Sequence, residues 1–507
     1  MSAKAHFSME RNWGFLRKSF QYLAFMGVPF IKDRVFVLEF FGKLNCLINS
    51  WIWGLPLIIL LVGSGLYLSV RFGLIQLRGF YHAIATLCGK NQEKNAEGEI
   101  SPFRSLTTAL SGTIGTGNIV GVAAAILLGG PGAVFWMWVS AFVGMAIKFT
   151  SCTLAVHFRK LEPDGEVHGG PMYFIAQGLG PKFKWMAGAF SFFTILASFG
   201  IGTTFQVNNF VINLHVLFAG AEARDPSFLF CFISGLFYAT VLGAIIIGGV
   251  KKIGSATVRI VPFMFAFYFI TALIILCSHY EAIPGAFAAI FKYAFETPAA
   301  LTGGVIGTVV KQGLARGLFS NEAGLGSASI AHAAAHTRHP VRQGLVAMLG
   351  PFVDTVLVCT LTALVILVTS ATDYSSVKGE LTAVAFRLGL GSWWGEKSIS
   401  FVILLLAFST TLSWAYYGDR ASGYLFGKKG IKIYHVVYLV TVMIGACTNI
   451  ESIIIFSDTA NGLMAISNLI AALLLSPLVA KLLRDYFRNR TTSSAIKTSA
   501  PELQSDP

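Results

Sequence analysis

Charged residues are scarce in this chain. Only 12% of its 507 residues are Asp, Glu, Lys or Arg, whereas an average soluble protein carries about 25%. Hydrophobic residues make up 55% of the chain, and its mean hydropathy is +0.68. A soluble domain of this length would need more polar surface than these residues supply. Because a helix needs roughly 20 apolar residues to cross the hydrocarbon of a bilayer, the long apolar runs predict an all-α, polytopic membrane protein.

Cysteine pairs and basic clusters are also missing. The seven cysteines are scattered singly, which argues against a disulfide framework and against a cysteine metal site. The net charge of +14 is spread among short segments, so we expect no nucleic-acid partner. We also expect no cleavable signal peptide, because charged residues interrupt the apolar patches near the N-terminus.

Eleven apolar segments are long enough to span a membrane. They cover residues 52–75, 105–129, 132–157, 183–207, 227–249, 258–279, 303–330, 343–370, 398–418, 432–449 and 459–483. Residues 1–51 are mixed in composition and are expected to form a surface segment with an amphipathic helix around 34–49. Residues 488–507 are polar and rich in Ser, Thr and Pro, and they are expected to be a disordered tail.

Lysine and arginine are distributed unevenly between alternate loops. With the N-terminus outside, the inner loops and the C-terminal tail carry 23 of these residues, and the outer loops carry five. Because basic residues are enriched in cytoplasmic loops, this asymmetry predicts a protein of the inner (cytoplasmic) membrane with an outside N-terminus and a cytoplasmic C-terminus. Residues 1–51 conflict with this orientation, since they carry seven basic residues. The short loops obey the rule best and are given more weight.

Two of the spans are interrupted by glycine and polar residues. One contains SGTIGTGNIVG (111–121), and the other contains KQGLARGLFSNEAGLGSA (311–328). They lie five spans apart, so they take equivalent places if residues 105–279 and 303–483 are two repeats that follow an extra helix at 52–75. Five is an odd number, so the second repeat would cross the membrane inverted. Paired interruptions of this kind indicate the binding site of a secondary transporter.

The stretch 111–121 has three interpretations. Its glycines resemble a phosphate-binding loop, but no strand precedes them and no lysine follows. Close packing of helices through small residues explains the glycines, but not Thr113, Thr116 and Asn118 at the same depth. An unwound helix explains both, because irregular backbone at membrane depth lines a cavity. The carbonyls and amides that such a break exposes suit a small cation and a zwitterion.

Longer strings around the two interruptions resemble a known family. TALSGTIGTGNIVGVA and GLARGLFSNEAGLGSA are similar to the alanine or glycine:cation symporters, which have the amino acid–polyamine–organocation architecture. The likeness runs from about residue 50 to residue 485 and includes GEVHGGPMYFI (165–175), FGIGTTFQVNN (199–209) and LAFSTTLSWAYYGDR (406–420). It implies a five-plus-five inverted repeat, a broken first helix in each repeat and one preceding helix. It also implies uptake of alanine, glycine or a similar small neutral amino acid, with Na⁺ as the coupling ion.

The resemblance also implies which residues form the site. The substrate would contact residues in and around both breaks: Thr113, Gly115, Thr116, Gly117, Asn118, Gln206, Phe319, Ser320, Asn321 and Trp414. The sodium ion would be held by carbonyls near Thr113 and Ile114 and by the hydroxyls of Thr410 and Thr411. The chain departs from the family's usual pattern at Thr203, where an asparagine is usual, and this leaves the selectivity of the pocket open.

Two of these assignments have structural alternatives. Four hydroxyl residues occur within 409–413, and each could simply bond a carbonyl of its own helix. Their density at bilayer depth favours a cation site. Trp414 is expected either to form a wall of the substrate site or to be an aromatic residue at the membrane interface.

Five charged residues fall inside the predicted spans: Lys148, Lys311, Arg316, Glu322 and Asp354. Each is costly in lipid and is therefore a candidate for a functional role. Arg316 precedes the second interruption and Glu322 follows it, so this pair is a candidate gate. Glu322 or Asp354 is alternatively a proton carrier, and structural pairing is an equal alternative for all five.

Three histidines occur at i, i+4 and i+7, namely His332, His336 and His339. This spacing could hold zinc on one face of a helix, but the glutamate of an HExxH motif is absent. We expect a solvated loop here, and a membrane enzyme that uses residues 332–339 is the alternative from a different class. The preferred prediction is a transporter without enzymatic activity that symports Na⁺ and a small neutral amino acid. Proton coupling is the main alternative within transport.

Overall fold

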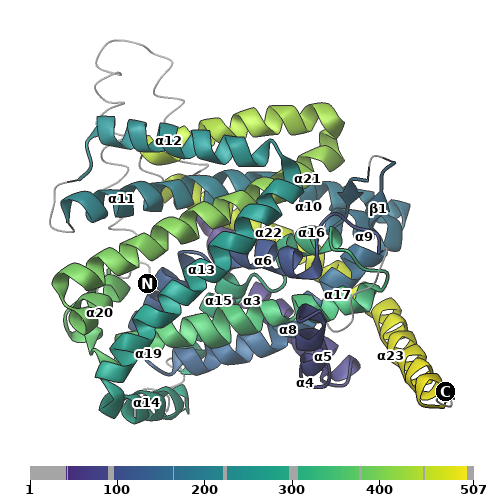
Figure 1. The fold of residues 1–507 in the computed structure, drawn as a ribbon, viewed down its shortest axis with the longest axis horizontal. Helices are drawn as coiled ribbons and strands as arrows, with labels where there is room; N and C mark the ends of the chain where they lie inside the picture. Colours follow the sequence, from purple (N-terminus) through teal and green to yellow (C-terminus); the bar gives the residue numbers. More distant parts are fainter. Residues whose placement is uncertain are drawn as a thin grey trace, which may run out of the picture. The chain divides into compact units, whose positions relative to one another are not determined.

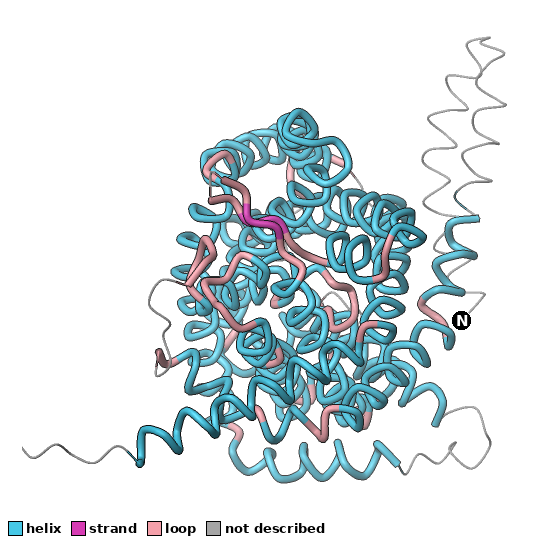
Figure 2. The backbone as a smooth tube through the Cα atoms, turned by 90° about the vertical axis from the view of Figure 1, so that its right-hand side faces the viewer, coloured by secondary structure: helices cyan, strands magenta, loops and turns pink. Residues whose placement is uncertain are grey.

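The computed structural model describes residues 42, 44–89, 96–163, 165–220, 225–295, 306–375, 380–448 and 451–499. Almost all of the described chain is helical (Figure 2), which confirms the predicted all-α class. Within these residues the strands are β1 (Lys160–Leu161) and β2 (Val167–His168), which pair antiparallel with Lys160 opposite His168. The chain divides into two units, Met1–Trp51 and Ile52–Pro507. Most of the first unit, including most of the expected amphipathic helix at 34–49, lies outside the described residues.

The elements of the second unit are labelled in Figure 1. Its first half contains α3 (Leu55–Arg71), α4 (Ile75–Arg78), α5 (Phe80–Leu87), α6 (Pro102–Thr113), η1 (Gly117–Gly121), α7 (Val122–Gly129), α8 (Ala133–His157), α9 (Pro171–Gly178), η2 (Pro181–Phe183), α10 (Lys184–Phe199), η3 (Gly200–Thr204), α11 (Phe205–Ala219), α12 (Phe228–Ile246), α13 (Gly249–Ser278), η4 (Tyr280–Ala282) and α14 (Ile283–Phe295). Its second half contains α15 (Ile306–Asn321), α16 (Ser327–Ala333), α17 (Pro340–Ala347), α18 (Leu349–Pro351), η6 (Phe352–Cys359), α19 (Thr360–Val368), η7 (Ala371–Asp373), α20 (Leu381–Leu390), α21 (Ser392–Cys447), α22 (Glu451–Leu474) and α23 (Ser476–Ser499).

The number of membrane crossings depends on how broken helices are counted. Among the described residues, seven helices are long and apolar enough to cross a membrane, or up to nine if each bent pair is one span. Two features bring this count toward the predicted eleven. Helix α21 changes direction at Gly427 (φ 67°), and without that kink its 56 residues would extend about 84 Å. The pair α15 and α16 supplies the second interrupted span.

Both predicted interruptions are breaks in the structure. Helix α6 and the segment Gly117–Gly129 meet at 55°. Between α15 and α16, residues 322–326 leave the helical conformation, with Glu322 (φ 50°), Gly324 (φ 104°) and Gly326 (φ 87°) in the left-handed region. Glycine has no Cβ and adopts such angles readily, which explains why this break falls at AGLG. Glu322 therefore lies in the break and does not follow it as predicted.

Helix α6 lies between two groups of helices. On one side it packs against α16, which in turn packs against α8, and α8 also contacts α15 and α17. On the other side it packs against α13 and α21, and α21 also contacts α10, α11 and α12. Figure 1 shows α6 near the middle of these labelled helices. The first break is thus surrounded by protein, as irregular backbone at membrane depth requires.

The end of the chain differs from the prediction. Helix α23 runs from Ser476 to Ser499, so residues 488–499 are helical, whereas the sequence predicts a disordered tail over 488–507. The first part of α23 packs against α17 and buries Val479 and Leu483. Once the first turns of a helix have formed, each further residue adds a hydrogen bond at little cost. The polar composition of residues 488–499 alone does not reveal this extension of the helix.

Candidate functional site

The first break is closed by a side chain from its own turn. Helix α6 ends where Ile114 becomes extended (φ −74°, ψ 94°). The side-chain oxygen of Asn118 accepts a hydrogen bond from the Gly115 N–H at 3.0 Å, and the Gly115 carbonyl accepts one from the Asn118 N–H at 3.1 Å. Outside the regular helices of the described chain, no hydrogen bond uses the carbonyl of Thr113 or Ile114. The break therefore leaves two main-chain oxygens for a guest.

A hydroxyl of α21 lies against this break. A Cβ atom added at Gly115 would be 3.1 Å from Thr410 Oγ1, so the threonine side chain approaches the unwound backbone directly. Thr410 Oγ1 is buried and has no hydrogen-bond partner among the described residues. One turn further on, Ser413 Oγ donates to the Thr108 carbonyl of α6 at 2.7 Å. The face of α21 that carries Thr410 and Ser413 is therefore the face that covers α6.

Thr411 points elsewhere. Its Oγ1 donates to the Ala407 carbonyl at 2.9 Å and accepts a hydrogen bond from the Tyr238 hydroxyl of α12 at 2.7 Å. Neighbouring residues on a helix do not share a face, so Thr410 and Thr411 do not both reach the first break. Thr410 and the carbonyls at the end of α6 therefore remain candidate oxygen ligands, whereas the Thr411 hydroxyl forms a structural contact with α12.

Asp354 joins the two breaks. This carboxylate lies in η6 and is fully buried. Its Oδ1 accepts a hydrogen bond from Asn118 Nδ2 at 2.7 Å, and its Oδ2 accepts from Ser320 Oγ and Thr355 Oγ1, each at 2.9 Å. Asn118 belongs to the first break, and Ser320 lies at the end of α15 before the second. Both ends of the Asn118 amide are bonded within this network, so Asn118 holds the break in shape.

The second break is filled by polar contacts of the chain itself. Asn321 Oδ1 accepts a hydrogen bond from the Ala323 N–H at 2.9 Å, and its carbonyl accepts one from Lys148 Nζ at 3.0 Å. The Glu322 carboxylate accepts a hydrogen bond from Ser327 Oγ at 2.7 Å. Asn321, Glu322, Ser327 and Lys148 are buried polar residues. Ala323 contributes its main-chain N–H. The two breaks are therefore chemically unlike.

Two aromatic side chains lie against glycines of the candidate site. Trp414 is 0% exposed, which excludes the alternative of an aromatic residue at the membrane interface. Its indole side chain interacts with the Glu322 carboxylate, and its Cβ would be 2.5 Å from a Cβ added at Gly202. A Cβ added at Gly117 would touch the Phe319 ring at 3.7 Å. Bulky aromatic side chains therefore lie directly against both glycines.

Two further residues assigned to the substrate are buried near these groups. Thr116 Oγ1 and Gln206 Oε1 have no hydrogen-bond partner in the described chain, whereas Gln206 Nε2 donates to the Ile201 carbonyl at 3.2 Å. Gln206 follows the π-helical segment η3, and η1 and η6 are also π-helical. Such segments occur frequently at functional sites, and here all three carry or adjoin candidate site residues.

The remaining charged candidates separate into distinct environments. Lys311 is exposed, and Lys148 is buried. Arg316 is partly buried and interacts electrostatically with Asp458 of α22. The predicted gate partner of Arg316 is Glu322, whose carboxylate instead accepts a hydrogen bond from Ser327 and interacts with Trp414. The structure therefore does not join Arg316 and Glu322 in one gate.

The three histidines do not form one helix face. His332 is fully buried near the end of α16, where its Nδ1 contacts Gln343 Nε2 at 2.7 Å and Ser105 Oγ at 3.2 Å. His336 and His339 are exposed and lie after the helix has ended. The expectation of a solvated loop is therefore wrong for His332, because α16 continues the interrupted span that far. The described residues contain no group of three or more His, Cys, Asp or Glu that could hold a metal ion.

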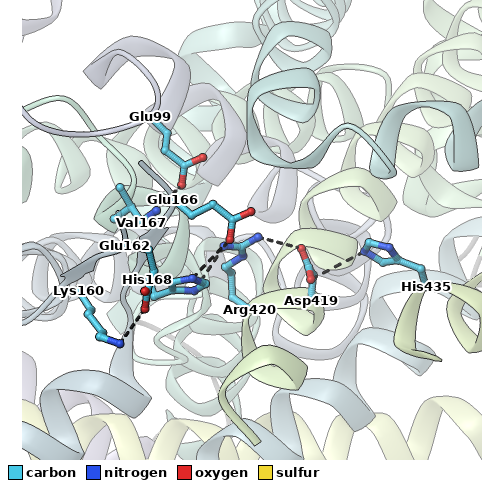
Figure 3. Close-up of polar contacts among 9 residues, drawn as sticks. All are labelled: Glu99, Lys160, Glu162, Glu166, Val167, His168, Asp419, Arg420 and His435. Carbon is cyan, nitrogen blue, oxygen red and sulfur yellow. Dashed lines mark hydrogen bonds and ion pairs between the residues drawn. The ribbon is translucent and has the colours of Figure 1, made fainter. Parts of the chain in front are cut away.

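A second polar network, which the sequence did not single out, surrounds Arg420 (Figure 3). Arg420 Nη2 lies 3.3 Å from Asp419 Oδ2, and Nη1 lies 3.7 Å from Glu166 Oε2 and 3.4 Å from His168 Nδ1. On the far side, His435 Nε2 lies 3.8 Å from Asp419 Oδ1. The network ties α21 to the loop that carries β1 and β2. In the sequence, the charged residues of the string GDR (418–420), at the end of a predicted span, are the feature that could have indicated this network.

Burial changes the pKa values of the loop residues in this network. Burial and the positive charge of Arg420 lower the pKa of His168. Burial raises the pKa of Glu99, although its carboxylate accepts a hydrogen bond from the Val167 N–H at 2.7 Å. The folded protein therefore favours the neutral form of both side chains.

Comparisons with known proteins agree with this geometry. Residues 39–500 match the model of the sodium:alanine symporter family. The chain is 45% identical to an uncharacterized transporter of Haemophilus influenzae, over 87% of this chain and 95% of the relative. It is 42% identical to the sodium/alanine symporter AgcS of Methanococcus maripaludis, over 87% and 96%. It is 36% identical to the probable sodium/glutamine symporter GlnT of Bacillus subtilis, over 87% and 90%.

A solved structure supports the fold. The crystal structure of MhsT in complex with L-phenylalanine superposes with a TM-score of 0.51 and covers 76% of this chain and 98% of MhsT, at 14% sequence identity. At that identity the likeness concerns the fold alone, which is the LeuT fold of a multi-pass membrane transporter. The broken helices, the family match and the relatives lead to one conclusion. The chain belongs to the sodium:alanine symporter family, whose members are transporters and not enzymes.

Proposed function

We propose that this protein takes up alanine, glycine or a similarly small neutral amino acid together with Na⁺. The observation that carries the proposal is the unpartnered Thr410 hydroxyl against the unwound end of α6, where the Thr113 and Ile114 carbonyls are free of hydrogen bonds outside regular helices. Hard cations such as Na⁺ take oxygen ligands, and these groups offer oxygens without a fixed charge. The sodium ion would bind between α6 and α21.

The size of the guest is inferred from the aromatic side chains. Trp414 packs on Gly202, and the Phe319 ring lies beside Gly117. A substrate that binds the main chain of the first break would meet these rings with its side chain. Relatives of this chain are named for alanine and for glutamine, and the close packing favours the smaller of the two. The hydroxyl of Thr116, which has no hydrogen-bond partner in the described chain, is the polar group we assign to the substrate.

Proton coupling is the second candidate for the energy source. Asp354 is a buried carboxylate bonded to both breaks, so a change in its charge would act on the whole site. Its partners are neutral amide and hydroxyl groups, and they suit an ionised carboxylate because each is able to donate. We favour Asp354 as a permanently ionised group and Na⁺ as the coupling ion.

Counterflow in proteoliposomes tests the proposal. Vesicles loaded with unlabelled alanine should accumulate labelled alanine when Na⁺ is present, and should fail to do so in choline. Excess glycine should compete with alanine, and excess glutamine should compete weakly. Uptake that is unchanged in choline but abolished by removal of a proton gradient would contradict the sodium proposal. Strong competition by glutamine would contradict the inferred size limit.

The orientation in the membrane is also part of the proposal. The distribution of basic residues supports an inner-membrane protein with the N-terminus outside and the C-terminus inside. In that orientation residues 71–104 face the cytoplasm, and the end of α13 faces the outside. The repeats at 105–279 and 303–483 would then be inverted relative to each other around the two breaks.

A further inference from the structure

Arg159 binds four main-chain carbonyls at one end of the bundle. It follows the C-terminal end of α8. Its Nη1 donates to the carbonyls of Ala333 at 3.0 Å and Ala335 at 2.7 Å. Its Nη2 donates to the carbonyls of Glu97 at 2.9 Å and Thr337 at 2.8 Å. One side chain thus joins the segment before α6 to the end of α16 and the segment after it.

Main-chain hydrogen bonds join the same two segments. The N–H groups of Glu99 and Ile100 donate to the Ala334 carbonyl at 2.8 Å and 3.2 Å. In return, the Ile100 carbonyl accepts a hydrogen bond from the His336 N–H at 2.7 Å. Ile100 and Ala335 form a parallel bridge. The bridge lies just before α6 and just after α16, so it connects the two broken helices on one side of the breaks.

Arginine is the side chain that suits this place. We refer to Arg159 with residues 97–100 and 333–337 as the Arg159 clamp. A guanidinium is planar and carries five N–H donors in a fixed fork, and here its two terminal nitrogens meet four acceptors. The last carbonyls of a helix lack partners within the helix and carry partial negative charge, so the positive charge also suits the end of α16. A lysine carries its donors on one nitrogen and could not span both pairs of carbonyls.

Glycine at position 98 allows the two segments to meet. Gly98 has φ 147°, and a Cβ added there would lie 2.6 Å from the carbonyl carbon and oxygen of Ala335 and from the nitrogen of His336. Beside it, Glu99 Oε1 accepts a hydrogen bond from the Val167 N–H of β2 at 2.7 Å (Figure 3). The hairpin that follows Arg159 therefore holds the same segment.

The contacts with α21 are of another kind. Ser413 Oγ of α21 donates to the Thr108 carbonyl of α6 at 2.7 Å. Near the clamp, Arg420 Nη1 of α21 lies 3.7 Å from Glu166 Oε2. Each is a side-chain contact that can break by itself. Parting α6 from α16 would break the main-chain bonds of the clamp and separate the carbonyls that Arg159 holds together.

We infer that Arg159 is a positioning residue for transport. Its guanidinium fastens the start of α6 to the end of α16, so that these two helices move together, relative to α21, when the site opens on this side. In the proposed orientation this side faces the cytoplasm. The role in transport rests on the proposed function, whereas the clamp itself is independent of any substrate. Arg159 touches no guest and acts through the two segments that it joins.

A disulfide across the clamp tests whether the two helices move together. Neighbouring strands lie about 4.7–4.9 Å apart, and the Cα atoms of a disulfide lie about 4.4–6.8 Å apart, so the double variant Ile100→Cys with Ala335→Cys should be oxidised in place. Mass spectrometry identifies the bond between positions 100 and 335, and wild type treated with the same oxidant controls for the native cysteines. Failure to form the bond would contradict the geometry of the clamp.

Counterflow of the oxidised double variant gives the decisive result. It should remain near the counterflow of the reduced form, because a bond between parts that move together restrains nothing. Loss of alanine counterflow on oxidation, reversed by a reductant, would show that the two segments must separate. That result would overturn the inference.

Substitutions test the part played by Arg159 itself. Arg159→Gln removes the fork, and Arg159→Lys keeps the charge without the fork. Arg104→Gln is the matched control, because it makes the same change at an exposed position of α6. R159Q and R159K should slow counterflow by about tenfold or more, the effect of losing one hydrogen bond to a charged donor. Their Kd for alanine should be unchanged, because the clamp lies away from the breaks, and R104Q should match wild type in both measurements.

Three results would contradict this role. A full rate in R159K would show that a positive charge at the end of α16 suffices. An equal loss of rate in R104Q would show a general effect of charge. A weaker alanine Kd at a normal rate in R159Q would place Arg159 in binding. In the supporting case, oxidation of the 100–335 cysteine pair in the R159Q background should restore the rate, since it replaces one fastening by another.

Hydrogen–deuterium exchange tests the clamp without transport. The amides of Glu99, Ile100, His336 and Thr337 are bonded across it, so they should exchange faster in R159Q than in wild type and R104Q. Unchanged exchange would contradict the fastening role. If the wild type itself shows no sodium-dependent counterflow, the proposed function fails, and the exchange comparison still decides the clamp. If R159Q cannot be purified, the cysteine pair still decides joint movement, because it leaves Arg159 intact.

Discussion

Asn118 Nδ2 lies 2.7 Å from Asp354 Oδ1. This bond connects a residue of the first broken helix with a carboxylate that also accepts from Ser320, at the end of the helix before the second break. The two interruptions are far apart in sequence but share one acceptor.

Asp354→Asn should weaken sodium-dependent alanine uptake strongly. The amide keeps the volume but replaces one acceptor by a donor, so at least one of Asn118, Ser320 and Thr355 would lose its bond at a cost of about 1–3 kcal/mol. Uptake should be measured at several external pH values. If Asp354 were a proton carrier, D354N would lose concentrative uptake but retain exchange that is independent of pH, and this result would reverse our assignment.

Thr410→Ala and Thr411→Ala should differ, although the residues are adjacent. T410A removes the hydroxyl that faces Gly115, so the Na⁺ concentration for half-maximal uptake should rise several-fold. T411A removes the bond to Tyr238 and should lower stability by about 1 kcal/mol without changing the sodium dependence. Sodium titrations of uptake, together with thermal melts, compare the two. A rise in the sodium requirement in T411A alone would place the ion on the other face of α21.

Gly115→Ala should disturb the first break more than Gly121→Ala. A methyl at Gly115 would lie 3.1 Å from Thr410 Oγ1, and alanine also favours continued helix by up to about 1 kcal/mol. A Cβ at Gly121 meets nothing within 4 Å, so G121A is the matched control and should bind alanine normally. Binding and Tm should be measured on both. Normal alanine binding by G115A would mean that the guest lies away from this backbone.

His168 should make the protein less stable in acid. The folded state lowers the pKa of His168, so the unfolded chain, with a pKa near about 6.5, takes up the proton first as the pH falls. Stability is therefore lost below about pH 6.5. The charged groups that face His168 are Arg420, Glu166, Glu162 and Asp419.

The comparison of wild type with His168→Gln isolates this effect. The wild-type Tm should fall more than the H168Q Tm when the pH is changed from about 7.5 to about 5.5. Glu99 acts in the opposite direction, because its raised pKa makes the folded state take up a proton first. Equal Tm losses in both proteins would show that His168 is already charged, or equally exposed, in the folded state.

Two exposed cysteines test the orientation. Cys88 follows α5 and Cys277 lies near the end of α13, and both are free and exposed. In variants that keep one of these cysteines and no other, a membrane-impermeant maleimide should label Cys277 in intact cells. Cys88 should be labelled only after the membrane is permeabilised. The reverse pattern would place the N-terminus inside.

The sequence predicts the position of both breaks but not what fills them. Glycine is required where the backbone is left-handed, so Gly324 and Gly326 mark the second break in the sequence itself. The roles of Asn118 and Thr411 depend on which neighbour each side chain meets, and those neighbours, Asp354 and Tyr238, lie more than a hundred residues away. Lys148 was visible as a buried charge, but its contact with Asn321 joins two helices whose packing no local pattern specifies.

The hydrogen bond between the Gly115 N–H and the Asn118 side chain has a thermodynamic consequence for the guest. A molecule as small as alanine has six non-hydrogen atoms and can contribute at most about 1.5 kcal/mol for each. Little of that binding free energy would remain to offset the cost of ordering a flexible loop. Because Asn118 fixes the unwound turn during folding, the conformational entropy is lost before the amino acid arrives. Under the proposed function, the affinity for a very small substrate would thus depend on a side chain that need never touch it.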